Sequence, residues 1–203
     1  DTIKLLSESI PRALEPVHHF ERTYSQYQED LILNEIFESK GTTNKFMVDI
    51  GAGNGIWISN SLFFRERGWK CLMIDGEPGE IGEQIGVQKH WVTRENINNI
   101  FKDNNVPTEP DLLSLDMDGN DYHLLKEIFK EFKPRVVIAE INIFFENRDA
   151  YMEYNENYNH HKERIKGYGQ SVAAAYRLGK ENGYRTVSLV ENTNIILVRE
   201  DVI

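Results

Sequence analysis

The chain has 203 residues, enough for one domain with a substantial core and few for two. Its 33 acidic and 23 basic residues give a formal charge of −10, which repels the phosphate backbone of nucleic acids. We therefore expect a small-molecule acceptor and no nucleic-acid partner. The sequence contains no apolar run long enough to cross a bilayer, so no membrane partner is expected. The single cysteine, Cys71, and the lack of a signal-peptide pattern favour a cytoplasmic protein.

The first part of the chain predicts an arm, a helix and two buried strands. Residues 1–23 have a weak helical pattern that two prolines interrupt, so we expect an N-terminal arm. Ser25 followed by Gln28 fits a capping box, which predicts a helix with Tyr27 on its apolar face and an end at Gly41. KFMVDIGAGNG then indicates a strand entering a glycine-rich turn, ISNSLFFRERG a helix and WKCLMID a second strand.

The second part continues the same alternation of strands and helices. QKHWVT is a weaker strand candidate, and Asn98 to Asp103 a short helix. DLLSLDMDG predicts a strand that ends on acids, and PRVVIAEIN a central strand covered on both faces. SVAAAYRLGKENG predicts the last helix, capped by Gly183, before a hairpin of YRTVSLVE and TNIILVRE. The helix before Pro134 has one apolar face, formed by Leu124, Leu125, Ile128, Phe129 and Phe132.

This order of elements predicts an α/β fold over residues 1–203, a single domain with a doubly wound, mostly parallel sheet and a C-terminal antiparallel hairpin. Residues 143–168 break the alternation because they are polar and rich in aromatic side chains. We expect an inserted lid whose tyrosines and amides recognise a polar ring such as a sugar. A surface excursion or an oligomer contact is the alternative for this segment.

A glycine-rich turn, residues 51–55, follows the first strand, where an open parallel sheet binds its ligands. A dinucleotide fingerprint would need a third glycine at position 56, which is Ile56. Asp49 precedes the turn, and its carboxylate disfavours a pyrophosphate but suits the cationic methionyl end of S-adenosylmethionine. Asp75 ends the second strand, where an acid can accept hydrogen bonds from both ribose hydroxyls.

VDIGAGNG followed by MIDG resembles the first two motifs of the class I S-adenosylmethionine-dependent methyltransferases, which have a Rossmann-like fold. Further segments resemble the FkbM-like group, whose members are commonly O-methyltransferases of sugars and natural products. These segments are SQYQEDLIL, SNSL, LLSLDMDGNDYH, VVIAEIN and the stretch from GQSVAAAYRLGKENGYRTV to NIILVRED, which together cover most of residues 24–201. The resemblance implies a methyltransferase with S-adenosylmethionine as its cofactor.

The resemblance also implies where the cofactor binds. The glycine turn and the acid before it would line the cofactor, the end of the second strand would hold its ribose, and Thr93 would lie near its adenine. The expected cofactor residues are Asp49, Gly51, Gly53, Asn54, Gly55, Asp75, Gly76, Thr93 and Asp116.

Acidic side chains gather at the ends of the fourth and fifth strands. Asp116, Asp118 and Asp121 follow one strand, and Glu140 with Asn142 ends the next. Neighbouring strand ends lie about 5 Å apart, so these oxygens should converge. Asp116, Glu140 and Asn142 could bind Mg²⁺ or Mn²⁺, similar to the metal-dependent O-methyltransferases. Alternatively one acid is a general base while the others position the cofactor and substrate, or the acids only cap and turn the chain.

His123 falls in the first turn of the following helix, where the dipole favours a neutral imidazole that can accept a proton. With Asp116 and Glu140 it completes the candidate catalytic set. The sequence predicts an enzyme that transfers a methyl group from S-adenosylmethionine to a hydroxyl of a small polar acceptor, such as a sugar, sugar nucleotide or natural product. A non-catalytic cofactor-binding module and an NAD-dependent oxidoreductase are the alternatives.

Overall fold

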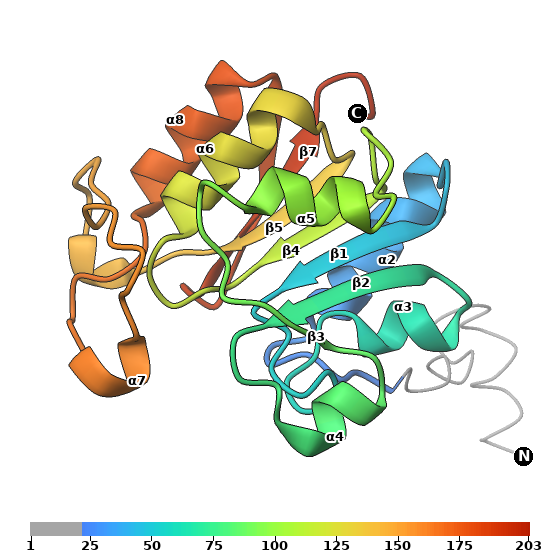
Figure 1. The fold of residues 1–203 in the computed structure, drawn as a ribbon. Coiled ribbons are helices and arrows are strands. Elements are labelled where there is room, and N and C mark those ends of the chain that lie inside the picture. Colours follow the sequence, from blue (N-terminus) through green and yellow to red (C-terminus); the bar gives the residue numbers. More distant parts are fainter. Residues whose placement is uncertain (1–21) are drawn as a thin grey trace, which may run out of the picture.

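The computed structural model describes residues 22–203, in which a seven-stranded sheet has helices on both faces (Figure 1). The strands lie in the order β3-β2-β1-β4-β5-β7-β6, and only β7 runs antiparallel to its neighbours β5 and β6. This arrangement confirms the predicted mostly parallel sheet with a C-terminal hairpin. The strands are β1 (Phe46–Ile50), β2 (Lys70–Asp75), β3 (Gln88–Lys89), β4 (Leu112–Leu115), β5 (Val136–Glu140), β6 (Tyr184–Val190) and β7 (Asn194–Arg199).

Helices α5, α6 and α8 cover one face of the sheet, and α2 and α3 cover the other (Figure 1). Successive side chains of a strand point to opposite faces of the sheet. Val48 and Ile50 therefore pack in the core beneath α5, α6 and α8, and Met47 packs in the core beneath α2 and α3. The helices are α2 (Glu29–Lys40), α3 (Leu62–Glu66), α4 (Gly79–Gln84), α5 (Ile97–Asp103), α6 (Asp121–Glu131), α7 (His160–Glu163) and α8 (Val172–Glu181), with a 3₁₀ turn η1 (Ile143–Phe145). In the described part of the chain, no helix has the length and apolar character needed to span a membrane.

The start of α2 differs from the predicted capping box. Gln28 has a left-handed backbone (φ 66°), the helix begins at Glu29, and the Gln28 side chain does not cap it, whereas the Ser25 hydroxyl accepts the Asp30 amide hydrogen at 3.2 Å. The Ser25 hydroxyl also donates to the Asp30 carboxylate at 2.8 Å. This carboxylate therefore holds the residues that precede the helix by hydrogen bonds. Tyr27 lies before the helix and is exposed. The rest of the predicted N-terminal arm, residues 1–21, lies outside the described residues.

Helix α4 was absent from the sequence prediction because the segment that forms it is rich in glycine, which disfavours helices. One of these glycines is needed for packing, since a Cβ on Gly82 would lie 3.2 Å from the Asn54 Cα in the glycine turn. The candidate strand QKHWVT contributes only the two residues of β3. At the end of α8 the cap is Asn182, and the predicted cap Gly183 follows it.

Candidate active site

A cleft of about 390 Å³ opens over the carboxyl ends of β1, β2 and β4. Its walls come from the glycine turn, the end of β2, residues 91–92, the turn after β4 and residues 158–161. This is the position at which open parallel sheets bind ligands. The predicted cofactor residues that line it are Gly51, Gly53, Asp75, Gly76 and Asp116.

Backbone contacts hold the glycine turn tightly between two strand ends. Gly51 donates its amide hydrogen to the Ile74 carbonyl at 2.9 Å, and a Cβ at this position would lie 1.6 Å from the Asp116 carbonyl oxygen. Gly53 donates to Asp75 Oδ2 at 2.8 Å, and the amide of residue 77 donates to Oδ1 of the same carboxylate at 2.7 Å. Asp75 therefore ties the turn to the end of β2 while facing the cleft.

Three predicted cofactor residues support the turn without lining the cleft. The Asn54 side chain accepts hydrogen bonds from the amides of residues 56 and 57, both at 3.0 Å. Gly55 faces the hydrophobic side chains packed beneath the turn. Asp49 is buried on the α2–α3 face, where Ser61 and Ser114 hydrogen-bond to it, and burial raises its pKa. The predicted direct contact of Asp49 with the methionyl end is not supported by this placement.

Thr93, which we predicted to lie near an adenine, is outside the cleft, whereas residues 91 and 92 line it. The Thr93 amide donates to the Asn96 side chain at 2.8 Å, and Thr93 does not line the cleft. Trp91 and Val92 do, because the chain leaves the sheet at the end of β3 and turns across the cleft. A Cβ on Gly76 would lie 3.0 Å from the Trp91 ring, so a glycine lets the indole approach the end of β2.

Acidic side chains converge at the ends of β4 and β5 as predicted, but the residues that come together are not all those expected. Oxygens of Asp116, Asp118 and Glu140 all lie within 4.8 Å of one another. Asp118 arrives there through a left-handed turn (φ 52°), since β4 ends at residue 115 and the expected strand alternation stops there. Asp121 is instead fully buried and accepts the amide hydrogens of residues 117 and 119 at 2.8 and 2.9 Å.

Asp116 lines the cleft, and its carboxyl group hydrogen-bonds to that of Glu140. Enclosure by protein raises the pKa of both groups, and the charges of the neighbouring acids raise it further. Two carboxyls this close cannot both ionise easily, so the pair keeps at least one proton well above the ordinary carboxyl range. Tyr168, one of the tyrosines of the expected lid, hydrogen-bonds to Glu140.

Asn142 is placed away from this acid cluster by its own hydrogen bonds. Its side-chain oxygen accepts the Phe144 amide hydrogen at 2.9 Å, and its side-chain nitrogen donates to the carbonyls of Lys166 and Tyr168 at 2.9 and 3.0 Å. All of its polar atoms are therefore used in holding the chain around η1. The structure groups Asp118, in place of the predicted Asn142, with Asp116 and Glu140.

The segment 143–168 covers the ends of β4 and β5 and is fixed to the domain at several points (Figure 1). Tyr151 stacks on Tyr122 with ring centroids 3.7 Å apart. The indole of Trp91 donates to the Glu156 carbonyl at 2.6 Å, and Tyr158 packs its ring against Gly119. Residues 158–161 of this segment thereby form one wall of the cleft.

His123, in α6, contacts the 143–168 segment and does not line the cleft. Its Nε2 donates to the Met152 carbonyl at 2.8 Å, and its ring packs edge-on against Tyr151 and Tyr154. Burial lowers the pKa of His123. The structure therefore does not bring the predicted third catalytic residue together with Asp116 and Glu140.

We expect acid to loosen this contact. Because the folded-state pKa of His123 is depressed, the contact is fully stabilising above the ordinary histidine pKa and weakens as the pH falls through it. Hydrogen exchange of amides 151–156, corrected for intrinsic rates, should therefore accelerate by roughly threefold more in the wild type than in His123→Gln between pH 7 and pH 5. Equal acceleration in both proteins would contradict a role for this imidazole in holding the 143–168 segment.

No protein-family model and no curated protein matches the chain, but solved structures do. The precorrin-6y C5,15-methyltransferase of Geobacter metallireducens GS-15 is 12% identical over 87% of this chain and 88% of that chain, with a TM-score of 0.50. The magnesium protoporphyrin IX methyltransferase of Synechocystis PCC 6803, with bound SAH, is 11% identical over 84% and 81%, with a TM-score of 0.49.

An O-methyltransferase family protein from Burkholderia thailandensis is 9% identical with a TM-score of 0.47, and the match covers 83% of this chain. The chain spans 56% of the length of that protein. At such identities a structural match shows a shared fold. The chain therefore has a Rossmann-like α/β fold that is also found in methyltransferases.

Proposed function

We propose that this protein is an S-adenosylmethionine-dependent methyltransferase that methylates a hydroxyl of a small polar acceptor. The observation that carries the proposal is the Asp75 carboxylate, which faces the cleft beside a glycine turn pressed against the end of β4. The fold is compatible with this activity, and the sequence motifs around both features resemble those of class I methyltransferases. The FkbM-like resemblance extends the proposal to a sugar or natural-product acceptor, and the single cysteine supports a cytoplasmic location.

The residues present fit the nucleoside part of this cofactor. Each oxygen of Asp75 accepts one backbone hydrogen bond, and a carboxylate has about four acceptor positions, so two ribose hydroxyls can still be bound. Trp91 offers an aromatic wall beside this carboxylate for a planar base. The absence of a glycine at position 56 disfavours a dinucleotide.

Bound S-adenosylmethionine would supply an electrophilic methyl group, so the chain must orient the acceptor and take its proton. Asp116 is suited to the second task because it reaches the cleft and shares a proton with Glu140 behind it. With the proton of the pair on Glu140, the ionised Asp116 carboxylate accepts the hydroxyl proton, and the hydrogen bond between the two carboxyls holds the base in place.

A divalent cation is the second candidate for assisting the transfer. The close approach of oxygens from Asp116, Asp118 and Glu140 favours it, since Mg²⁺ and Mn²⁺ prefer oxygen ligands. A cation there would orient and acidify the acceptor hydroxyl in place of a general base. The two possibilities differ in their response to chelation.

Calorimetry with S-adenosylhomocysteine tests the cofactor assignment. Asp75→Ala should weaken binding by roughly 30- to 100-fold, because hydrogen bonds to a charged group are lost on the ribose and on the turn. Asp103→Ala, which removes an exposed acid at the end of α5, should bind as the wild type does.

Other outcomes separate the alternatives. Unchanged affinity of Asp75→Ala would remove this carboxylate from the ribose site. Binding of NADH, with none of S-adenosylhomocysteine, would indicate the oxidoreductase. Tight binding without a methylated product from any acceptor would favour the non-catalytic module.

A further inference from the structure

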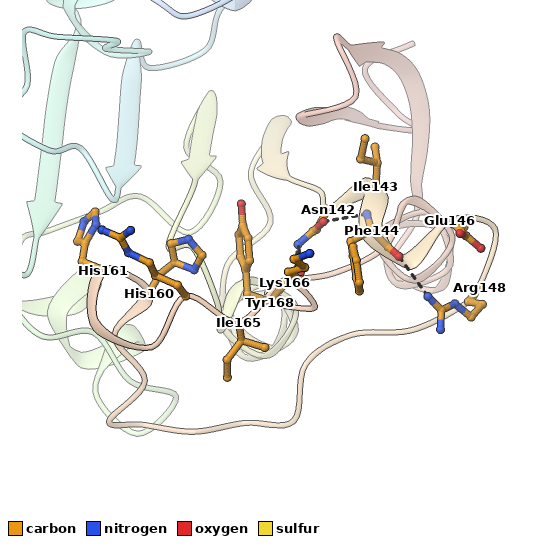
Figure 2. Close-up of a pocket in the computed structure, with 11 residues that line it drawn as sticks. Asn142, Ile143, Phe144, Glu146, Arg148, His160, His161, Ile165, Lys166 and Tyr168 are labelled. Carbon is orange, nitrogen blue, oxygen red and sulfur yellow. Dashed lines mark hydrogen bonds between the residues drawn. The ribbon is translucent and has the colours of Figure 1, made fainter.

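A groove of about 870 Å³ lies between η1 and residues 160–168, next to the proposed cofactor cleft. His160 and His161 line both spaces, so the groove and the cleft are adjacent. Figure 2 shows His160 and Tyr168 pointing toward the strand ends, with Arg148 at the opposite end of the groove. One end of a molecule in this groove would lie beside Tyr168, which hydrogen-bonds to Glu140 of the carboxyl pair, and the other end could extend past η1.

The groove is basic on a strongly acidic protein. Arg148, Arg164 and Lys166 line it together with the two histidines, and Glu146 is the single acidic side chain among the lining residues that the structure describes. The whole chain carries a formal charge of −10, so this local excess of cations is opposite to the general surface. Such a reversal of potential attracts an anion and raises its local concentration.

These cations are not neutralised by neighbouring acids. Within residues 22–203, the side chains of Arg164 and Lys166 have no ion pair or hydrogen bond. Arg148 donates to the carbonyls of residues 145 and 144 at 3.0 and 3.1 Å, which holds its guanidinium without cancelling its charge. A cation fixed by backbone carbonyls can bind an oxyanion without a large loss of side-chain entropy.

The backbone that carries these side chains is also fixed. Arg164 ends α7 in a left-handed conformation (φ 49°), and the Asn142 side chain binds the carbonyls of Lys166 and Tyr168. The exposed side chains of Phe144 and Ile165 add apolar surface beside the basic side chains of the groove. The groove thus combines cations on a fixed backbone with apolar contacts, next to the cleft that Asp116 lines.

We propose that this groove binds the methyl acceptor, and that the acceptor carries an oxyanion, a phosphate or a carboxylate, held by Arg164 and Lys166 while its hydroxyl faces the carboxyl pair. The inference rests on the proposed methyl transfer for the identity of the ligand as an acceptor. The anion site itself rests on the charge and geometry of the groove.

Anion titrations followed by ¹⁵N–¹H NMR at constant ionic strength test the site. The probes are inorganic phosphate, acetate and chloride. In the wild type, phosphate or acetate should produce saturable shifts of amides 161–168 where chloride does not. Arg164→Glu with Lys166→Glu should weaken this binding by roughly tenfold or more, since two charge-assisted contacts become repulsive. The stronger of the phosphate and acetate responses identifies the acceptor's anionic group.

A matched double variant controls for net charge. Lys70→Glu with Lys180→Glu changes the total charge equally at two exposed positions outside the groove, and should bind the probes as the wild type does. Equal loss in both double variants, or equal responses to all three anions, would overturn the anion site. S-adenosylhomocysteine affinity, measured on the same proteins, should remain unchanged. Its absence in the wild type would refute methyl transfer while leaving the anion result interpretable.

Discussion

Replacing Asp116 with Asn should lower kcat by between about a hundredfold and ten-thousandfold, the range that a positioned general base contributes. The asparagine keeps the shape of the side chain on the cleft floor but cannot take a proton. Cofactor affinity should change much less than kcat, because the ribose is assigned to Asp75 at the end of β2. Rates are to be measured by product mass with an acceptor selected from phosphate- and carboxylate-bearing hydroxyl compounds.

The proton shared by Asp116 and Glu140 can be observed without any acceptor. In a ¹³C NMR titration of side-chain carboxyls, the wild-type pair should release its protons in two separated steps, the upper one far above an ordinary carboxyl. Glu140→Gln removes one negative charge from this pair. The remaining Asp116 pKa should therefore fall below the wild-type upper step, and Asp116→Asn should likewise abolish that step.

The experiment has two controls: a variant of an acid far from the cleft, and a chelator that removes divalent cations. Asp103→Asn, at an exposed site on α5, should leave both the titration and kcat unchanged. A general base predicts that EDTA has no effect, whereas loss of activity restored by Mg²⁺ or Mn²⁺ would favour the cation site. If Asp116→Asn retains kcat within about tenfold of the wild type, this carboxylate is not the base.

Much of the fold could be predicted because its signals are local. Buried strands such as VVIAE and LLSL are short apolar runs, and the apolar face from Leu124 to Phe132 specifies α6. The carboxyl ends of parallel strands meet at one edge, so the convergence of Asp116 with Glu140 followed from topology alone. The glycine turn was located for the same reason.

The remaining features depend on contacts between distant segments. Helix α4 contains Gly82 because it packs on the glycine turn, and this requirement cannot be seen in its own sequence. Trp91 replaces Thr93 at the cleft because β3 ends early and the following chain changes direction. His123 and Asn142 were expected at the reaction centre, but both bind backbone carbonyls of the 143–168 segment. Polar residues near strand ends can thus support a wall as well as perform chemistry.

Alanine substitutions in the glycine turn should also have large effects on stability and nucleoside binding, and these effects should differ between two neighbouring positions. Gly51 and Gly53 both have a positive φ, at 80° and 55°, so alanine at either position costs about 1–2 kcal/mol in backbone strain. Only at Gly51 would the new Cβ meet the backbone, 1.6 Å from the Asp116 carbonyl oxygen, whereas nothing lies within 4 Å at Gly53. Gly51→Ala must therefore separate the turn from the end of β4.

We expect Gly51→Ala to lose about 3 kcal/mol or more of unfolding free energy in urea and most of its affinity for S-adenosylhomocysteine. Gly53→Ala should lose only the strain energy, which makes it the internal control for a positive φ. Gly68→Ala, in the exposed turn before β2 (φ 78°), should lose similar stability but bind the nucleoside normally. Equal losses at Gly51 and Gly53 would show that conformational strain, and not close approach of the two strand ends, explains the glycines in this turn.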